Sequence, residues 1–330
     1  MIAALKRVVA CETLDREQAR NAMMDMMTGE GIDTLTASFL TAYNLRQPTL
    51  EELQGFVDAL MELCEPIDLD AADAVDIVGT GGDGKNTFNI STLSALIVAA
   101  AGVLVVKHGN YGSTSICGSS NVLEVLGYKF TNRRDLLAKQ LEDASICFLH
   151  APLFHPVMDR MKQVRRDLGM QTIFNLLGPL VNPASPGSLL LGVGRHSDIR
   201  RYQYLLQATE RSYTIVHSMD GYDEISLTEK FKAVGRNGVR VFCPEDIGFS
   251  RVQPEDLNAG GTIEDAAKVF ARILQGHGTK EQETVVIVNS AFAIQCARPE
   301  IRLSECIEMA TDSLKSGKAY QTLKKLIELS

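Results

Sequence analysis

The sequence predicts an α/β protein with a small helical N-terminal domain and a larger domain built on a mostly parallel sheet flanked by helices. Two observations support this fold class. Residues 1 to about 70 contain no strand-like run, whereas from Ala74 onward runs rich in β-branched residues alternate with helical segments. Such alternation is typical of parallel β-α-β units. We therefore place the helical domain at 1–72 and the α/β domain at 73–330.

The composition is that of an ordinary globular chain. It has 330 residues, 45% hydrophobic and 22% charged, which is enough for about two domains. No run approaches the ~20 apolar residues of a membrane span, and the N-terminus carries charge too early for a signal peptide. A net charge of −8 disfavours nucleic acid or an anionic membrane as partner. We expect a cytoplasmic protein.

The cysteines argue against both a disulfide framework and a zinc site. There are seven, an odd number, and none forms a C-x-x-C pair. We expect them to be reduced residues of the core.

The clearest helix of the N-terminal region begins after Pro48. Thr49 and Glu52 have the spacing of a capping box, in which each side chain pairs with a backbone N–H at the helix start. Apolar residues then recur on one face at Leu53, Val57, Leu60, Met61 and Cys64. Apolar faces left over in this domain are expected to form a dimer contact.

Apolar runs divide the α/β region into strands and helices. We expect strands at Val75–Val78, Val103–Val106, Ser145–Leu149, Leu189–Val193, Tyr213–His217, Gly238–Phe242 and Thr284–Val288. Helices are expected at Ser91–Ala101, Arg134–Glu142, Pro156–Leu168, Ile199–Ala208, Thr262–Leu274, Ser304–Ser316 and Tyr320–Leu329. Ligands of such sheets bind beyond the carboxyl ends of the strands. The loops beginning at Gly79, Lys107 and Ser218 are therefore candidate walls of one site.

The stretch from Asp76 to Ser91 predicts a strand, a glycine-rich turn and a helix capped by Asn89 or Ser91. Its four glycines allow positive φ and a close approach of the backbone to a ligand. Unpaired N–H groups beside a helix N-terminus attract anions, so phosphate is the first ligand to consider. Such a loop is equally typical of a tight connection. Its spacing fits neither the P-loop nor the dinucleotide fingerprint, which implies a ligand other than ATP or NAD.

Two further loops carry polar groups. Residues 107–120 are rich in hydroxyls and glycines and begin with a lysine, which suits an oxyanion-rich ligand and a solvated connector equally. Asp223 and Glu224 follow a predicted strand. Adjacent carboxylates are usually solvated, but facing phosphates they would bind Mg²⁺.

Residues 155–178 contain further candidates. Arg165 and Arg166 lie on a helix that begins near His155-Pro156. Paired arginines are more often at the surface, but a guanidinium that faces a cleft is the natural bidentate partner of a carboxylate. The histidines lack metal-site spacing, and no nucleophile with its base can be justified from spacing.

Eight motifs in consistent order resemble those of the anthranilate phosphoribosyltransferase family. They are Gly79-Thr80-Gly81-Gly82-Asp83, Asn89-Ile90-Ser91-Thr92, Lys107-His108-Gly109-Asn110, Gly118-Ser119, His155-Pro156, Val164-Arg165-Arg166, Thr172–Pro179 and Asp223-Glu224-Ile225-Ser226. Each motif alone is weak, but the likeness extends from the N-terminal helices to the C-terminus. It implies a helical domain completed by a segment near 165–185, a larger α/β domain and a homodimer.

The resemblance also implies a reaction, in which anthranilate is joined to phosphoribosyl pyrophosphate (PRPP) and pyrophosphate is released as a step of tryptophan synthesis. The implied PRPP site contains Gly79, Gly82, Asp83, Thr87, Asn89, Ile90, Ser91, Thr92, Lys107, His108, Gly109, Asn110 and Ser119. The implied Mg²⁺ ligands are Ser91, Asp223 and Glu224. The implied anthranilate site contains Gly79, Asn110, His155, Arg165 and Gly178. Because the amine can attack the sugar itself, no protein nucleophile is needed, and Asn110, Arg165 and Lys107 would act by positioning.

Two positions depart from the family pattern. Members often have an arginine where this chain has Tyr111, and a basic residue at the place of Ile116. Without these two cations, the hold of this loop on phosphate is expected to be weaker. We expect normal chemistry, with PRPP held more by Lys107, by hydroxyl groups and by Mg²⁺.

Two alternatives stay open. A pyrimidine nucleoside phosphorylase shares the general fold, and a non-catalytic relative could bind nucleic acid instead. The Asn89–Thr92 motif, the Asp223-Glu224 pair and Arg165 favour PRPP and an aromatic acid over the first alternative. The net charge of −8 counts against the second.

Overall fold

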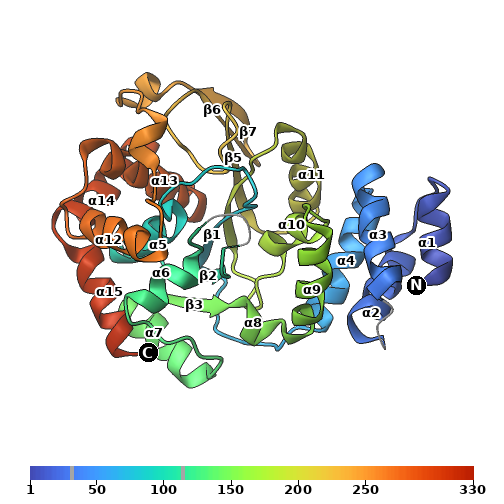
Figure 1. Cartoon of the computed structure of the whole chain (residues 1–330). Helices are drawn as coiled ribbons and strands as arrows, with labels where there is room; N and C mark the ends of the chain where they lie inside the picture. The colour runs from blue at the N-terminus through green and yellow to red at the C-terminus, as the bar shows by residue number, and fades with distance from the viewer. Residues whose placement is uncertain (30–32, 113–115) are drawn as a thin grey trace. The chain divides into compact units, whose positions relative to one another are not determined.

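The chain forms two compact units (Figure 1). The structure, a computed structural model, describes residues 1–29, 33–112 and 116–330. The smaller unit consists of Met1–Pro66 and Ala151–Pro183, and the larger of Ile67–His150 and Ala184–Ser330. The first segment of the smaller unit thus ends before residue 72, and its second segment begins before residue 165.

The smaller unit is helical throughout its described residues. Its helices are α1 (Ile2–Val9), α2 (Arg16–Thr28), α3 (Asp33–Leu45), α4 (Leu50–Glu62), α8 (Ala151–Phe154), α9 (Arg160–Leu168) and α10 (Phe174–Leu177), with 3₁₀ turns η1 (Pro156–Asp159) and η2 (Gly178–Leu180). The predicted helix Pro156–Leu168 is therefore a 3₁₀ turn followed by α9. Capping boxes start two of the helices, Asp15 with Gln18 at α2 and Thr49 with Glu52 at α4.

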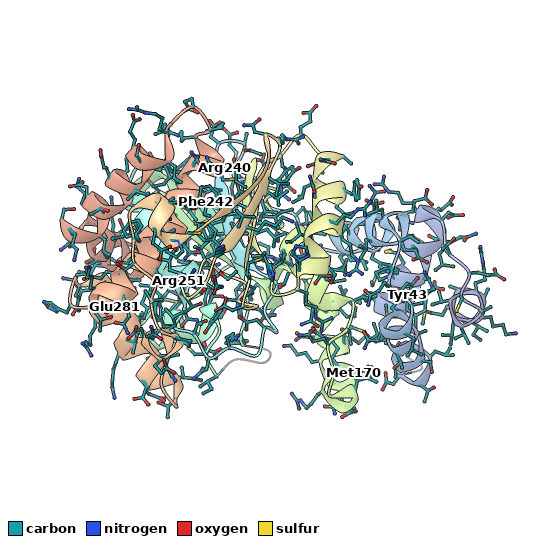
Figure 2. The ribbon with its side chains drawn as sticks, turned by 90° about the horizontal axis from the view of Figure 1, so that it is seen from above. Tyr43, Met170, Arg240, Phe242, Arg251 and Glu281 are labelled. Atoms are coloured by element: carbon teal, nitrogen blue, oxygen red, sulfur yellow. The ribbon has the colours of Figure 1, made fainter. Side chains whose placement is uncertain are left out.

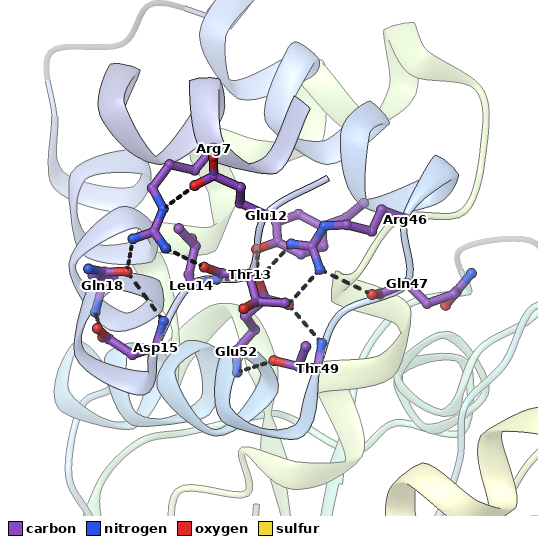
Figure 3. A network of polar contacts seen from close by, with 11 residues as sticks. Arg7, Glu12, Thr13, Leu14, Asp15, Gln18, Arg46, Gln47, Thr49 and Glu52 are labelled. Carbon is purple, nitrogen blue, oxygen red and sulfur yellow. Dashed lines mark hydrogen bonds and ion pairs between the residues drawn. The ribbon is translucent and has the colours of Figure 1, made fainter. Parts of the chain in front are cut away.

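A buried carboxylate, Glu52 of α4, links α4 to α3 and to the segment before α2 (Figure 3). Its oxygens accept hydrogen bonds from Leu14 N (2.9 Å), Tyr43 Oη (3.0 Å) and Thr49 N (2.7 Å). The Arg46 guanidinium donates two more, at 2.6 and 3.1 Å. Although burial favours the neutral acid, these donors hold the pKa of Glu52 below its ordinary value. The carboxylate therefore stays charged and fully paired.

The larger unit is built on a seven-stranded sheet with the order β3-β2-β1-β4-β5-β6-β7. The strands are β1 (Val75–Gly79), β2 (Val105–Gly109), β3 (Ile146–His150), β4 (Ser188–Gly192), β5 (Ser212–Ser218), β6 (Phe231–Gly235) and β7 (Gly238–Phe242). Strands β1 to β5 pair in parallel, and β6 and β7 extend the sheet in antiparallel fashion. The predicted fold class is confirmed.

Helices cover both faces of this sheet (Figure 1). The helices of the larger unit are α5 (Ile90–Ala100), α6 (Ser119–Val125), α7 (Arg134–Ala144), α11 (His196–Gln207), α12 (Ile263–Leu274), α13 (Lys280–Ala297), α14 (Leu303–Lys315) and α15 (Lys318–Glu328), with 3₁₀ turns η3 (Pro244–Ile247) and η4 (Pro254–Leu257). On one face α5 packs on β1 and β2 and α13 on β1, β4 and β5, and on the other α11 packs on β5 and β6. The buried residues of α5 and α13 lie on all sides of each helix rather than on one face, as expected of helices in the centre of a domain. No helix in the described part of the chain is both long and apolar enough to cross a membrane.

The segment Thr284–Val288 is not the strand that its β-branched residues predict. It lies within α13, which begins with a capping box formed by Thr279 and Gln282. The helix start and burial among the sheet, α5 and α14 override the local β propensity. Strand β6 and helix α6 have no counterpart among the predicted elements.

Strand β7 forms one edge of the sheet and is largely exposed. The Arg240 guanidinium lies over the ring of Phe242, 4.6 Å from its centroid (Figure 2). Phe242 in turn packs against Phe231 and Phe292. A charged side chain thus covers the apolar end of the edge strand, which hinders pairing with another chain.

All seven cysteines are free thiols, but not all belong to the core. Those at 64, 117, 147, 296 and 306 are buried. Cys243 is half-buried and Cys11 is exposed. The prediction of core cysteines is therefore wrong for Cys11, whose positive φ of 61° places it in a turn directly after α1.

Candidate active site

The sheet brings two polar loops together at the carboxyl ends of its parallel strands. The order of its strands reverses between β1 and β4, the position at which ligands of parallel sheets bind. Strands β1, β4 and β5 are parallel neighbours and end at Gly79, Gly192 and Ser218. The glycine loop after β1 and the Asp223-Glu224 loop after β5 therefore meet at the carboxyl ends of these strands.

The glycine loop packs directly on the Asp223 carboxylate. Gly81 N donates a hydrogen bond to Asp223 Oδ2 at 2.7 Å. Thr80 N donates to Gly192 O at 2.9 Å. A Cβ at Gly79 would overlap the Asp223 carboxylate, and one at Gly192 would overlap the Asp223 backbone. Glycine is thus required at Gly79 and Gly192 by close packing, and at Gly81 by a φ of +65°.

The carboxylates of Asp83, Asp223 and Glu224 lie close enough to affect one another. Burial, followed by the charge of Asp83, raises the pKa of Asp223 to about 7. Burial, followed by the charge of Asp223, raises the pKa of Glu224 to about 8. Asp83 Oδ2 lies 3.5 Å from Asp223 N. Like charges held close to the buried Asp223 are unfavourable, so this cluster favours binding of a cation.

Lys107 supplies part of the opposite charge. It lies in β2 with 2% of its surface exposed. Its Nζ donates to a backbone carbonyl of β1 and, at 3.4 Å, to Ser91 Oγ. Burial lowers the pKa of Lys107, and the surrounding carboxylates, among them Glu224 and Asp223, oppose that effect. One ammonium group facing several carboxylates leaves the cluster short of positive charge.

Polar side chains also gather at the start of α5. Asn89 is the N-cap residue, but its Nδ2 donates to Cys117 O at 2.9 Å rather than capping the helix. Among the residues that the structure describes, the buried Asn89 Oδ1 and Thr92 Oγ1 have no hydrogen-bond partner. Buried polar atoms without partners are costly, and a bound polar ligand would pair them.

Three other residues predicted for the PRPP site form the framework of these loops. Thr87 pairs with Asn258 in a short antiparallel bridge. Ile90 is buried in the hydrophobic core, so only its backbone is suited to a polar ligand. His108 is buried in β2, where its backbone N–H donates to Asp76 Oδ1 at 3.3 Å. The contacts of these three residues therefore stabilise the loops.

The second loop is held by contacts between its two ends. Ser119 Oγ donates to Asn110 O at 3.2 Å and packs against Gly109, where a Cβ would collide with it. Asn121 Oδ1 accepts a hydrogen bond from Gly112 N at 3.0 Å. Residues 113–115 of the loop lie outside the described part. The predicted substrate residues Asn110 and Ser119 are thus brought together.

Tyr111, one of the two departures from the family pattern, is anchored on its neighbours. Its hydroxyl donates to Glu124 Oε1 in α6 at 2.9 Å. Its ring meets His150 of β3 edge on, with centroids 4.9 Å apart. Ile116, the other departure, is exposed. In place of an arginine, the loop therefore has an aromatic residue that ties it to α6 and β3.

Three residues predicted for the anthranilate site lie in the smaller unit. His155 is buried with Nε2 2.8 Å from a backbone carbonyl, and burial lowers its pKa. Arg165 lies in α9, its guanidinium 5.5 Å from the ring centroid of the phenylalanine of α10, and burial lowers its pKa. Gly178 begins η2. Gly79 and Asn110 belong to the larger unit, and the grouping of all five residues stays a prediction.

The predicted metal ligands suit a hard cation. Asp83, Asp223 and Glu224 interact through their charges, but within residues 1–29, 33–112 and 116–330 no three His, Cys, Asp or Glu side chains are arranged so that they could hold a metal ion together. Ser91, Asp223 and Glu224 offer only two carboxylates and a hydroxyl. Mg²⁺ is commonly held by one or two carboxylates, with water and substrate phosphates completing its shell. The residues present therefore fit Mg²⁺ bound together with a phosphorylated substrate.

Sequence reasoning missed the loop after β4. Gly194 N donates to Thr80 Oγ1 at 3.4 Å, and a Cβ at Gly194 would lie 3.1 Å from Asp83 Cβ. The signal was a Gly-Val-Gly run at the end of a predicted strand, beginning at Gly192. Asn289, whose side chain accepts a hydrogen bond from Ile225 N in the carboxylate loop, carries no comparable local signal.

Comparison with known proteins finds relatives over nearly the whole chain. Residues 71–320 match the glycosyl transferase family α/β domain, and residues 2–64 match its helical bundle domain. An anthranilate phosphoribosyltransferase of Cytophaga hutchinsonii is 48% identical over 324 residues, covering 98% of this chain and 99% of that protein. One of Bacteroides thetaiotaomicron is 48% identical over 317 residues, covering 96% of each.

Solved structures give the same result. The crystal structure of anthranilate phosphoribosyltransferase from Thermus thermophilus matches with a TM-score of 0.92 at 34% identity, covering 99% of this chain and 98% of that one. The protein of that name from Saccharomyces cerevisiae, in complex with PRPP and Mg, matches with a TM-score of 0.90 at 26% identity. That match covers 99% of this chain and 97% of the yeast chain.

Proposed function

Because the chain belongs to the anthranilate phosphoribosyltransferase family, we propose that it transfers the 5-phosphoribosyl group of PRPP to the amine of anthranilate and releases pyrophosphate. The reaction is a step of tryptophan biosynthesis. The observation that carries the proposal is the acidic cluster around Asp223 and Glu224, packed on the glycine loop and short of positive charge. Such a cluster suits a cation that arrives with a phosphorylated substrate.

Mg²⁺ is the cofactor of this reaction. The yeast relative in complex with PRPP and Mg supports the choice of this ion. Ser91, Asp223 and Glu224 are its proposed ligands. When bound, the ion neutralises the charge that develops on the departing pyrophosphate. The raised pKa values of Asp223 and Glu224 support a site at which a cation replaces protons.

PRPP is proposed to bind at the glycine loop and the start of α5. Backbone N–H groups of a glycine loop beside a helix N-terminus bind phosphate oxygens. Asn89 Oδ1 and Thr92 Oγ1, both buried without a partner in the described chain, would pair with polar groups of the substrate. The remaining proposed residues are Gly79, Gly82, Asp83, Thr87, Ile90, Ser91, Lys107, His108, Gly109, Asn110 and Ser119.

Anthranilate is proposed to be recognised by both of its polar groups. Arg165 would bind the carboxylate, because a guanidinium matches a carboxylate in two-point geometry. Asn110 would fix the approach of the amine. His155, which is buried with a lowered pKa, would contribute a neutral ring. Gly79 and Gly178 complete the proposed set.

Catalysis is proposed to depend on positioning and electrostatics. The aromatic amine attacks C1 of the ribose as the bond to pyrophosphate breaks, and no covalent intermediate with the protein is needed. Donors that are already in place for the leaving group lower the barrier because they need no reorganisation. Holding the amine and the sugar in reactive geometry lowers the entropic part of the activation barrier as well. Lys107, Asn110 and Arg165 are the proposed positioning residues.

We further propose that the protein is a cytoplasmic homodimer that contacts its second copy through the helical unit. Exposed apolar side chains of that unit, Ile2, Val9, Leu45, Leu50 and Met170, support such a contact. Neither nucleic acid nor a membrane is a proposed partner.

The fluorescence of anthranilate tests the function directly. On mixing protein, PRPP, Mg²⁺ and anthranilate, the signal is expected to decay, and omission of any component is expected to abolish the decay. No decay together with phosphate-dependent release of uracil or thymine would favour a nucleoside phosphorylase. No turnover together with a salt-sensitive shift of DNA mobility would favour nucleic-acid binding.

A further inference from the structure

We propose that Asn289 is a positioning residue, which fixes the backbone that presents Asp223 and Glu224 to the metal. The inference rests on the proposed function, because it concerns the same two carboxylates. Asn289 lies in α13, far from them in sequence, and is fully buried.

The Asn289 amide pairs with both backbone groups of Ile225. Its Oδ1 accepts a hydrogen bond from Ile225 N at 3.1 Å, and its Nδ2 donates to Ile225 O at 2.8 Å. A residue of a neighbouring antiparallel strand makes the same exchange of two hydrogen bonds. The second amide hydrogen reaches Val285 O, one turn earlier in α13, at 2.9 Å. The side chain is therefore held to its own helix while it holds the loop.

This contact acts on the carboxylate pair because Ile225 follows Glu224 directly. The loop lies between β5 and β6, outside the ladder of the sheet. Ser218, the last residue of β5, supports the opposite side of the turn. Its Oγ donates to Glu224 O at 2.7 Å and accepts from Ser226 N at 3.1 Å. The backbone on the C-terminal side of the pair is thus fixed from two directions.

Helix α13 is a suitable anchor because it is itself immobilised. It packs against β1, β4, β5, α5 and α14. Apart from Ser290, the buried residues next to this position are apolar, such as Val285, Val286 and Val288. A buried amide within such a helix costs free energy unless it is paired. The Asn289 amide finds that pairing in the carboxylate loop, at Ile225, and in its own helix, at Val285.

Three variants separate positioning from mere structural support. Asn289→Ala removes both bonds to Ile225. Asn289→Asp keeps the shape and the acceptor but removes the donor to Ile225 O. Ser290→Ala is the matched control, because Ser290 is equally buried on the next position of α13 and donates to Val286 O within the helix.

The readout is the affinity for Mn²⁺ in the presence of PRPP, measured by electron paramagnetic resonance without anthranilate, so that no turnover occurs. We expect Asn289→Ala to weaken Mn²⁺ binding by about tenfold, the size found when a residue that orients metal ligands is lost. Excess Mg²⁺ should restore much of kcat, and KM for anthranilate should stay within about twofold. Ser290→Ala should lower the melting temperature without changing Mn²⁺ affinity.

The outcomes are distinct. If Asn289→Ala or Asn289→Asp melts at lower temperature but binds Mn²⁺ as tightly as the wild type, Asn289 is only structural and the proposal is overturned. If Asn289→Ala fails to fold, Asn289→Asp decides, with weakened Mn²⁺ binding supporting the proposal and unchanged binding contradicting it. If the wild type itself binds no Mn²⁺ with PRPP and has no turnover, the proposed function fails, and this inference fails with it.

Discussion

Glu52 in the smaller unit and Asp223 in the larger are both buried carboxylates, yet their surroundings have opposite effects. Glu52 accepts hydrogen bonds from two backbone N–H groups, a tyrosine and an arginine, and its pKa is lowered. Asp223 accepts a bond from Gly81 N and faces other acids, and its pKa rises to about 7. Burial raises the pKa of both carboxyl groups. The donors around Glu52 outweigh that effect, whereas at Asp223 one backbone donor does not, and the charge of Asp83 adds to it.

We interpret the difference as that between a carboxylate that supports the structure and one that we propose binds the metal. A carboxylate whose lone pairs are all used by fixed donors has no capacity for a ligand and contributes to stability. Carboxylates crowded together with too few donors destabilise the protein until a cation binds. Active sites are where such unfavourable arrangements are found, because the substrate complex relieves them. Variants of the two carboxylates and their neighbours test this contrast, from the largest expected effect to the smallest.

Removing the charges of the acidic pair should abolish activity without loss of stability. For Asp223→Asn/Glu224→Gln we expect kcat/KM for PRPP to fall by about 10³-fold or more, because the charge on pyrophosphate is no longer neutralised. The melting temperature should not decrease, since like charges are removed. Anthranilate fluorescence and thermal unfolding measure the two effects. A Mg²⁺-dependent rate within about tenfold of the wild type would contradict the assignment.

Removing the charge of Glu52 should have the reverse effect. Glu52→Gln leaves the Arg46 guanidinium half-buried without its counter-charge, which should cost about 3 kcal/mol of unfolding free energy while kcat is unchanged. Urea unfolding provides the measurement. The matched control is Asp58→Asn, also on α4, which breaks an exposed ion pair with Arg16 and should cost less than about 1 kcal/mol. Equal losses in the two variants would show that pairing of Glu52 is not special.

The Glu52 contribution should also depend on pH. Its pKa in the folded protein lies below the ordinary value of 4.5, so its stabilisation is present in full above that value and is lost as pH falls through the folded pKa. We expect the difference in unfolding free energy between wild type and Glu52→Gln to stay constant at neutral pH and to shrink progressively as pH falls below 4.5. A difference that stays constant as pH falls below that value would mean that the charge of Glu52 is not the source of the stability.

Lys107→Ala removes the ammonium group that is placed among the acids of the site. KM for PRPP should rise by about tenfold, with a smaller change in KM for anthranilate, because the deletion makes the cluster more negative towards a phosphorylated substrate. Initial rates at varied PRPP measure the effect. An unchanged PRPP affinity would remove Lys107 from the proposed site.

The smallest effect is expected at Tyr111. Tyr111→Phe loses only the partly exposed bond to Glu124 and should change KM for PRPP by less than about threefold. Tyr111→Arg, which restores the cation common in the family, should lower KM for PRPP by about threefold at low salt, and the gain should vanish at high salt. A gain that is independent of salt would indicate a contact other than charge.

Much of the fold and part of the site could be predicted from the sequence because the signals were local. The glycine loop, the Thr49–Glu52 capping box and the Asp223-Glu224 pair are runs of neighbouring residues. Thr284–Val288 was mispredicted because its surroundings in the core, and not its β-branched side chains, decide its conformation. The role of Asn289 depends on Ile225, which is 64 residues away in sequence, so no local pattern signals it.

Carboxylates poor in donors should bind the metal, and the donor-rich carboxylate should not. Calorimetric titration of Mg²⁺ and PRPP into the wild type, Asp223→Asn/Glu224→Gln and Glu52→Gln tests this most directly. We predict Mg²⁺-dependent PRPP binding in the wild type and in Glu52→Gln, and its loss by about 100-fold or more in the double variant. Mg²⁺-dependent binding that survives in the double variant would contradict the metal assignment.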